Sequence, residues 1–138
     1  IIISGVCYGA ENGFLIGTIT GLVSNFFFGQ GIWTPFQMLG FGATGFVAGL
    51  IFYNRKHINY IVLAIIGGAI TFFVYGIIVD MSSIFYIAEG GGLKAMLVSY
   101  MTAIPFDLIN AGATCIFLVL IGKLMIKKIY RIKIKYGL

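Results

Sequence analysis

Apolar residues form long runs along this chain, and short polar or glycine-containing breaks separate them. The breaks fall at residues 11–13, 29–35, 54–57 and 89–92. An α-helix needs about 20 apolar residues to cross a bilayer, and the longer runs approach that length. We predict helices at residues 1–10, 14–28, 36–53, 58–79 and 104–126, a mixed segment at 81–103 and a basic tail at 127–138.

The first 28 residues allow two interpretations. The run at 14–28 is short for a membrane span, which favours one long helix from residue 1. Glu11, however, would then place a charge at mid-depth in the bilayer, which is costly. We therefore prefer a tight hairpin that turns at Glu11, Asn12 and Gly13.

Composition identifies lipid as the solvent of these helices. The chain has 138 residues, of which 60% are hydrophobic and 9% are charged. Soluble domains have about 25% charged residues, and a chain this short cannot bury so much apolar surface in one aqueous core. We predict an all-α, polytopic membrane helical bundle that forms a single domain over residues 1–138.

The basic residues predict the orientation of this bundle. All nine Lys and Arg residues except Lys94 lie either at Arg55 and Lys56 or in the C-terminal segment from Lys123. By the positive-inside rule, both groups are expected in the cytoplasm, with residues 30–34 and 89–94 outside. A basic segment that directly follows an apolar span is expected to contact anionic lipid and not nucleic acid.

Residues for catalysis or metal binding are few. The only histidine is His57, and no His, Cys or carboxylate cluster has the spacing of a metal site. No serine occupies a nucleophile elbow. Cys7 and Cys115 each lie in an apolar run and are expected to be inert, buried thiols. We predict no catalytic residue, no metal and no enzymatic activity.

Uncharged polar residues gather near the predicted outer ends of the helices. Polar side chains in apolar helices are costly unless they face a protein interior or a cavity, and together with neighbouring aromatic residues they are typical of a small-molecule pocket. Each also has a simpler interpretation: an interfacial aromatic belt, a helix cap or a solvated helix end. The candidate substrate-binding residues are Asn25, Gln30, Trp33, Thr34 and Gln37, followed by Asp80, Asp107 and Asn110.

Glycines recur every four residues in the first half of the chain. Residues four apart share one helix face, and glycine there lets two backbones approach closely. The repeat favours helix packing within the bundle, with a contact surface for another membrane protein as the alternative. The candidates for these contacts are Gly13, Gly17, Gly21, Gly45 and Gly49.

Several segments together resemble a known family. The block NFFFGQGIWTPFQ at residues 25–37 is its most specific part, and the resemblance continues at residues 13–17, 42–50, 75–80 and 104–110. These segments are similar to the substrate-binding S components of energy-coupling-factor (ECF) vitamin transporters. The resemblance implies a six-helix fold, of which the first helix and part of the second would precede this chain.

The resemblance also implies a function and partners. An S component captures a vitamin or related micronutrient at the outer face of a prokaryotic cell membrane. It associates with an ECF transmembrane coupling protein and two ABC ATPases, which alone use ATP, so no cofactor is expected here. The block at residues 25–37 is loosely similar to members for cobalamin or its precursors. The alternatives are a membrane scaffold that uses its glycines for packing, and an enzyme whose catalytic residues precede this chain.

Overall fold

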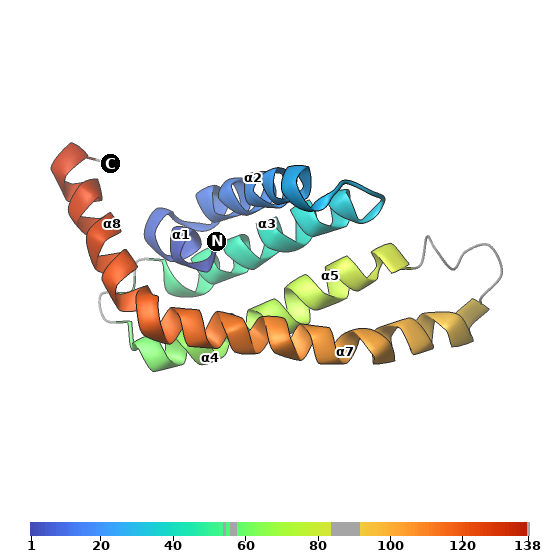
Figure 1. The fold of residues 1–138 in the computed structure, drawn as a ribbon. Coiled ribbons are helices and arrows are strands. Elements are labelled where there is room, and N and C mark those ends of the chain that lie inside the picture. The colour runs from blue at the N-terminus through green and yellow to red at the C-terminus, as the bar shows by residue number, and fades with distance from the viewer. Residues whose placement is uncertain (54, 56–57, 84–91, 138) are drawn as a thin grey trace.

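The computed structural model describes residues 1–53, 55, 58–83 and 92–137, and most of these form helices. The helices lie in two layers (Figure 1). One layer holds α1 (Ile2–Tyr8), α2 (Ala10–Phe28) and α3 (Trp33–Phe52). The other holds one continuous helix made of α4, η1 and α5, which packs against α7. The all-helical fold class predicted from the sequence is confirmed.

The second layer contains two π-helical segments within longer helices. α4 (Tyr60–Ile70) continues through η1 (Thr71–Gly76) into α5 (Ile77–Asp80). α7 (Gly92–Phe117) continues through η2 (Leu118–Gly122) into α8 (Lys123–Tyr136). Such wide turns are rare in helices and occur often at functional sites.

The first two helices meet at a sharp turn. Gly9 has φ of 95°, a conformation that side-chain-bearing residues rarely adopt, and it separates α1 from α2. Residues 1–28 are thus two helices, but the turn is at Gly9 and not at Glu11–Gly13 as expected. Glu11 instead lies in the first turn of α2 and is exposed, where a negative charge complements the helix dipole.

The last helices differ most from the sequence-based boundaries. The helix predicted at 104–126 begins earlier in the structure, at Gly92. Pro105 therefore lies inside α7 and not near its start. Prolines are tolerated inside membrane helices, where neighbouring groups satisfy the freed backbone carbonyl. The expected tail at 127–138 is helical as far as Tyr136, and it ends at Gly137 in the left-handed conformation. Of the expected break at residues 89–92, residues 89–91 lie outside the described residues, and Gly92 is the first residue of α7.

The glycine repeat forms the contact between α2 and α3. A methyl group added at Gly45 would collide with the backbone of Gly13, and one added at Gly17 would collide with the backbone of Phe41. Gly21 approaches the backbone of Met38 in the same way, and Gly49 approaches Ala10. These glycines therefore pack helices within the chain, and the buried faces they form are not available to another protein.

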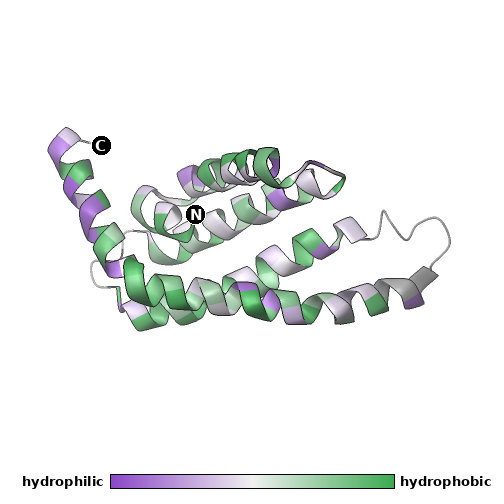
Figure 2. Cartoon of the chain, viewed as in Figure 1, coloured by the Kyte–Doolittle hydropathy of each residue, from purple (hydrophilic) through white to green (hydrophobic). Residues whose placement is uncertain are grey.

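Apolar side chains cover much of the outer surface. Phe27 and Phe28 are 83% and 87% exposed, and large side chains along α3, α4 and α7 are exposed as well. Three stretches of described residues are long and apolar enough to cross a membrane: Trp33–Phe52, Tyr60–Asp80 and Leu97–Tyr136. In Figure 2 hydrophobic colour dominates these helices, whereas hydrophilic residues gather on α8.

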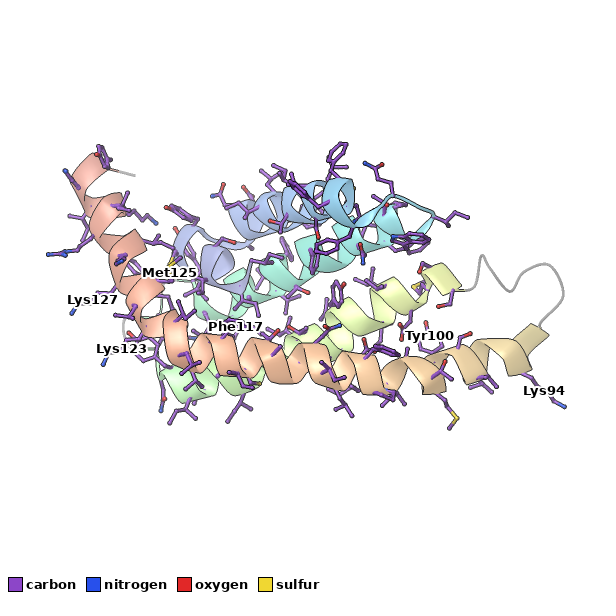
Figure 3. All side chains as sticks on the ribbon, in the orientation of Figure 1. Lys94, Tyr100, Phe117, Lys123, Met125 and Lys127 are labelled. Atoms are coloured by element: carbon purple, nitrogen blue, oxygen red, sulfur yellow. The ribbon has the colours of Figure 1, made fainter. Side chains whose placement is uncertain are left out.

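The two ends of the bundle have opposite character. α8 turns away from the line of α7 and lies across one end, where α3 ends and α4 begins (Figure 1). We call this the basic end, because Arg55 and the Lys and Arg residues of α8 lie there. We call the other the loop end; it holds the α2–α3 connection and the end of α5. Lys94 lies at the loop end, far from Lys123 and Lys127 (Figure 3).

Candidate functional site

Polar side chains from two helices are joined near the loop end. Asn25 of α2 is buried, with 3% of its surface exposed. Its amide nitrogen donates hydrogen bonds to the Gly21 carbonyl (2.8 Å) and to Oε1 of Gln37 on α3 (2.7 Å). Both amide hydrogens of Asn25 thus have acceptors, and the pair ties α2 to α3. The Gln37 side chain also lies near the Tyr75 hydroxyl.

Two carboxyl groups meet on the other layer. The side chains of Asp80, at the end of α5, and Asp107, on α7, lie within hydrogen-bond reach of each other. The Asp107 carboxyl group fits against Gly76, where a methyl group would collide with its oxygens. Two ionised carboxylates would repel each other, so this pair can share a hydrogen bond only when one carboxyl group holds a proton, and one negative charge is then placed there in place of two.

The remaining predicted residues of the α2–α3 connection have local contacts. Thr34 is buried, and its hydroxyl accepts a hydrogen bond from the backbone N–H of Gly31 (3.1 Å). Trp33 is half-buried and covers Gly31, and Gln30 is exposed. The structure therefore brings Asn25 and Gln37 together, and Asp80 and Asp107 together, whereas Gln30, Trp33 and Thr34 form the turn beside them.

A cavity of about 380 Å³ lies between the two layers. Asn110 lines it, one helical turn beyond Asp107. Tyr75 also lines it, so the cavity adjoins the Asn25–Gln37 pair. Its walls come from α1, α3, η1, α7 and η2, and both π-helical segments contribute side chains. The lining residues are Ile1, Ile2, Ile3, Phe41, Thr44, Thr71, Tyr75, Asn110, Ala113, Thr114, Phe117 and Leu118.

Threonine hydroxyls give this cavity a defined polarity. Thr44 donates to the Gly40 carbonyl (2.8 Å), and Thr114 donates to the Asn110 carbonyl (2.8 Å). Thr71 donates to the Gly67 carbonyl (3.0 Å) and lies 3.4 Å from the Thr114 hydroxyl. A hydroxyl that has donated its hydrogen retains acceptor lone pairs. These three oxygens can therefore accept hydrogen bonds from a bound molecule.

An aromatic pair forms one wall of the cavity. The rings of Phe41 and Tyr75 stack with centroids 4.7 Å apart and planes 19° apart. Together with Phe117 they give the cavity flat apolar surfaces, and Asn110 adds an amide that both donates and accepts. A few polar groups among apolar walls are the usual composition of a small-molecule site.

Of the eight candidate residues, Asn110 is the one that lines this cavity. The others were identified because amide and carboxyl groups are conspicuous in apolar runs. The polar and aromatic lining residues that were missed are Phe41, Thr44, Thr71, Tyr75, Thr114 and Phe117. The threonines interrupt apolar runs and could have been noticed as polar groups within spans. Phe41 and Tyr75 carry no such signal, because aromatic residues are equally common on lipid-facing surfaces.

Comparison with known proteins identifies the fold. The model of the family described as "ECF-type riboflavin transporter, S component" matches residues 1–130. No curated protein and no solved structure gives a significant match. The match confirms the resemblance seen in the sequence, and it also confirms that the chain is a substrate-binding transport protein and not an enzyme. The chain therefore belongs to the family of ECF-type riboflavin transporter S components, which are multi-pass membrane proteins.

Proposed function

We propose that this S component binds riboflavin, or a close flavin relative, in the cavity between its two helical layers and releases it unchanged during uptake. The observation that carries this proposal is the cavity itself, with stacked aromatic rings on one wall and hydroxyl and amide groups on the others. The description of the matching family supports the choice of vitamin.

Cavity size supports a flavin over cobalamin. Pockets for small molecules span roughly 300–1,000 Å³, and this cavity, at about 380 Å³, is near the lower limit. A tricyclic flavin with one sugar-alcohol chain suits such a volume. Cobalamin, with a macrocycle and an attached nucleotide, needs far more space. The flavin therefore replaces the cobalamin class that the block at residues 25–37 suggested.

The chemistry of the walls also fits a flavin. The flat isoalloxazine ring would stack on the surfaces that Phe41, Tyr75 and Phe117 provide. Its ring N–H and the hydroxyls of its side chain need acceptors, which Thr44, Thr71 and Thr114 supply. In this proposal the Asn25–Gln37 pair positions Tyr75, and the Asp80–Asp107 pair fixes the adjoining end of α5 against α7.

The proposed transport direction follows from the charges. With the basic end in the cytoplasm, the loop end faces outward. The bound vitamin would pass inward after association with an ECF coupling protein and two ABC ATPases. ATP is used by those partners in this proposal, and the chain itself needs no cofactor.

Riboflavin fluorescence tests this proposal. The protein purified in mild detergent should quench riboflavin fluorescence in a saturable way without ATP, because stacking on aromatic rings quenches the flavin. Thr114→Val should weaken binding about threefold to tenfold, the usual effect of losing one uncharged hydrogen bond. Thr102→Val is the matched control: Thr102 also donates to a carbonyl of α7, but it does not line the cavity.

Two outcomes would contradict the proposal. If wild-type protein binds neither riboflavin nor a flavin analogue, the scaffold alternative gains support. If cobalamin displaces riboflavin at equal concentration, the cavity does not select by size. Mass spectrometry of the ligand recovered after binding should return intact riboflavin, since an enzyme would convert it.

A further inference from the structure

A groove of about 470 Å³ lies at the basic end, apart from the cavity between the layers. One wall is α8, and the other is the start of α4 with Arg55 and Ile58 before it. Four cationic side chains line the groove: Arg55, Lys123, Lys127 and Arg131. Among the described residues that line it, none is acidic. This concentration of positive charge suits an anion.

The α8 wall has two distinct rows. Lys123, Lys127 and Arg131 are spaced four residues apart and share one face. Ile126, Tyr130 and Ile134 are also spaced four apart and form the adjacent row, and both rows line the groove. A ligand in this groove would therefore meet cations along one edge and apolar side chains along the other.

The position of the groove relative to the membrane is also defined. The candidate span Tyr60–Asp80 begins at Tyr60, which lines the groove together with Ile58. The groove thus lies where an apolar span emerges, at the depth of lipid headgroups. Tyrosines such as Tyr60 and Tyr130 are enriched at this depth. Lys123 and Lys127 point outward from this end of the bundle (Figure 3).

We propose that this groove binds one anionic phospholipid, with its phosphate between Arg55 and the basic row of α8 and the start of its acyl chains on Tyr130 and Ile134. The two rows favour a lipid over a soluble phosphate compound, because a soluble anion would leave the exposed Ile134 of the apolar row uncovered. Basic pockets between membrane helices are suited to such headgroups. This site is independent of vitamin binding.

Native mass spectrometry of the full chain in detergent tests the site. The probes are dioleoyl phosphatidylglycerol and dioleoyl phosphatidylcholine, which share acyl chains and differ in net charge. Wild-type protein should retain phosphatidylglycerol preferentially. The double variant Lys127→Gln, Arg131→Gln should bind it about thirtyfold more weakly, since each basic side chain near an anionic headgroup contributes roughly a factor of five.

The matched control is Lys128→Gln, Lys135→Gln, which removes the same charge from exposed positions of α8 outside the groove. It should keep the phosphatidylglycerol affinity of wild type. Equal loss in both double variants would overturn the proposal, because it would show diffuse attraction in place of a site. Equal retention of both lipids by wild-type protein would overturn it as well.

Two further measurements distinguish a lipid in the groove from a lipid held by α8 alone and from a soluble anion. Arg55→Gln changes the opposite wall and should weaken phosphatidylglycerol binding about fivefold; no change would mean that α8 alone attracts lipid and that the groove is not the site. Inorganic phosphate added at the lipid concentration should leave the lipid bound. Displacement by phosphate would overturn the proposal in favour of a soluble anion. All substituted side chains are exposed, so a symmetrical size-exclusion peak is expected for each variant.

Discussion

The two layers of this bundle are packed in different ways. Between α2 and α3, backbone meets backbone at Gly13, Gly17 and Gly45. Between α4 and the α7–η2 helix, side chains make the tightest contacts: the Cys115 thiol fits against Gly68 and donates to the Ala64 carbonyl (3.1 Å), and Leu118 packs on Gly67. The cavity adjoins this second layer, with its two π-helical segments. The glycine-packed layer thus has the closer backbone packing, and the other layer supplies most of the polar groups that line the cavity.

The largest effect is expected from breaking the glycine contact. In Gly45→Ala, the new methyl group meets the Gly13 backbone, which cannot move aside without separating the helices. We expect a loss of about 3 kcal/mol or more in the free energy of unfolding, at or above the upper range for overpacking. Unfolding by sodium dodecyl sulfate, followed by circular dichroism, measures it.

Gly112→Ala on α7 is the control for this contrast. A methyl group at Gly112 meets nothing within 4 Å, so the substitution should be neutral or stabilise the helix by up to about 1 kcal/mol. Equal destabilisation by the two alanines would contradict a steric cause, because an added methyl group has open space at Gly112 and meets backbone at Gly45.

A smaller effect is expected from the polar tie between α2 and α3. Asn25→Leu removes two hydrogen bonds and leaves Gln37 without its buried donor. Hydrogen bonds between membrane helices contribute about 0.6 kcal/mol on average and at most about 1.7 kcal/mol, so we expect a loss of about 1 kcal/mol. A double-mutant cycle with Gln37→Leu measures the coupling, and additive effects would contradict a direct tie.

The smallest effect is expected where α8 meets the first layer. The Lys133 ammonium group donates to the Cys7 carbonyl (3.2 Å) and lies 5.4 Å from the centre of the Tyr53 ring. Lys133→Gln should cost about 0.5–1 kcal/mol, the range of an accessible cation–π contact. Lys128→Gln, at an exposed position on the same helix, should cost less. If both change the unfolding midpoint equally, Lys133 does not hold α8 in place.

The class of fold was predictable from the sequence because the bilayer determines how long the apolar runs must be and where charged residues can lie. The glycine contact was also predictable, since a spacing of four residues defines one helix face. The predicted turn lay after the observed one at Gly9. The polar residues Glu11 and Asn12 are a stronger turn signal in the sequence than one glycine within an apolar run. Most of helix α8 was predicted as a basic tail, because its many Lys and Arg residues obscured the helical spacing of its apolar residues.

The candidate site was predictable only in part. Amides and carboxyls in apolar runs indicated Asn25, Gln37, Asp80 and Asp107, and the structure joins them in pairs. The cavity itself depends on how helices rotate about their axes, which a single sequence does not encode in any short motif. Phe41 and Tyr75 therefore emerged only when α3 and η1 were placed side by side.

The wide turns of η1 determine where the following residues point. Each residue advances an α-helix by about 100°. Deleting one residue between Thr71 and Gly76 would let an ordinary helix form there, and the residues after it would keep their direction, because the wide turns take up one extra residue. If all of these residues formed an ordinary α-helix instead, the carboxyl group of Asp80 would point about 100° away from Asp107. The surplus residue in η1 thus sets the angle at which α5 follows α4, and this angle directs the Asp80 carboxyl group toward Asp107.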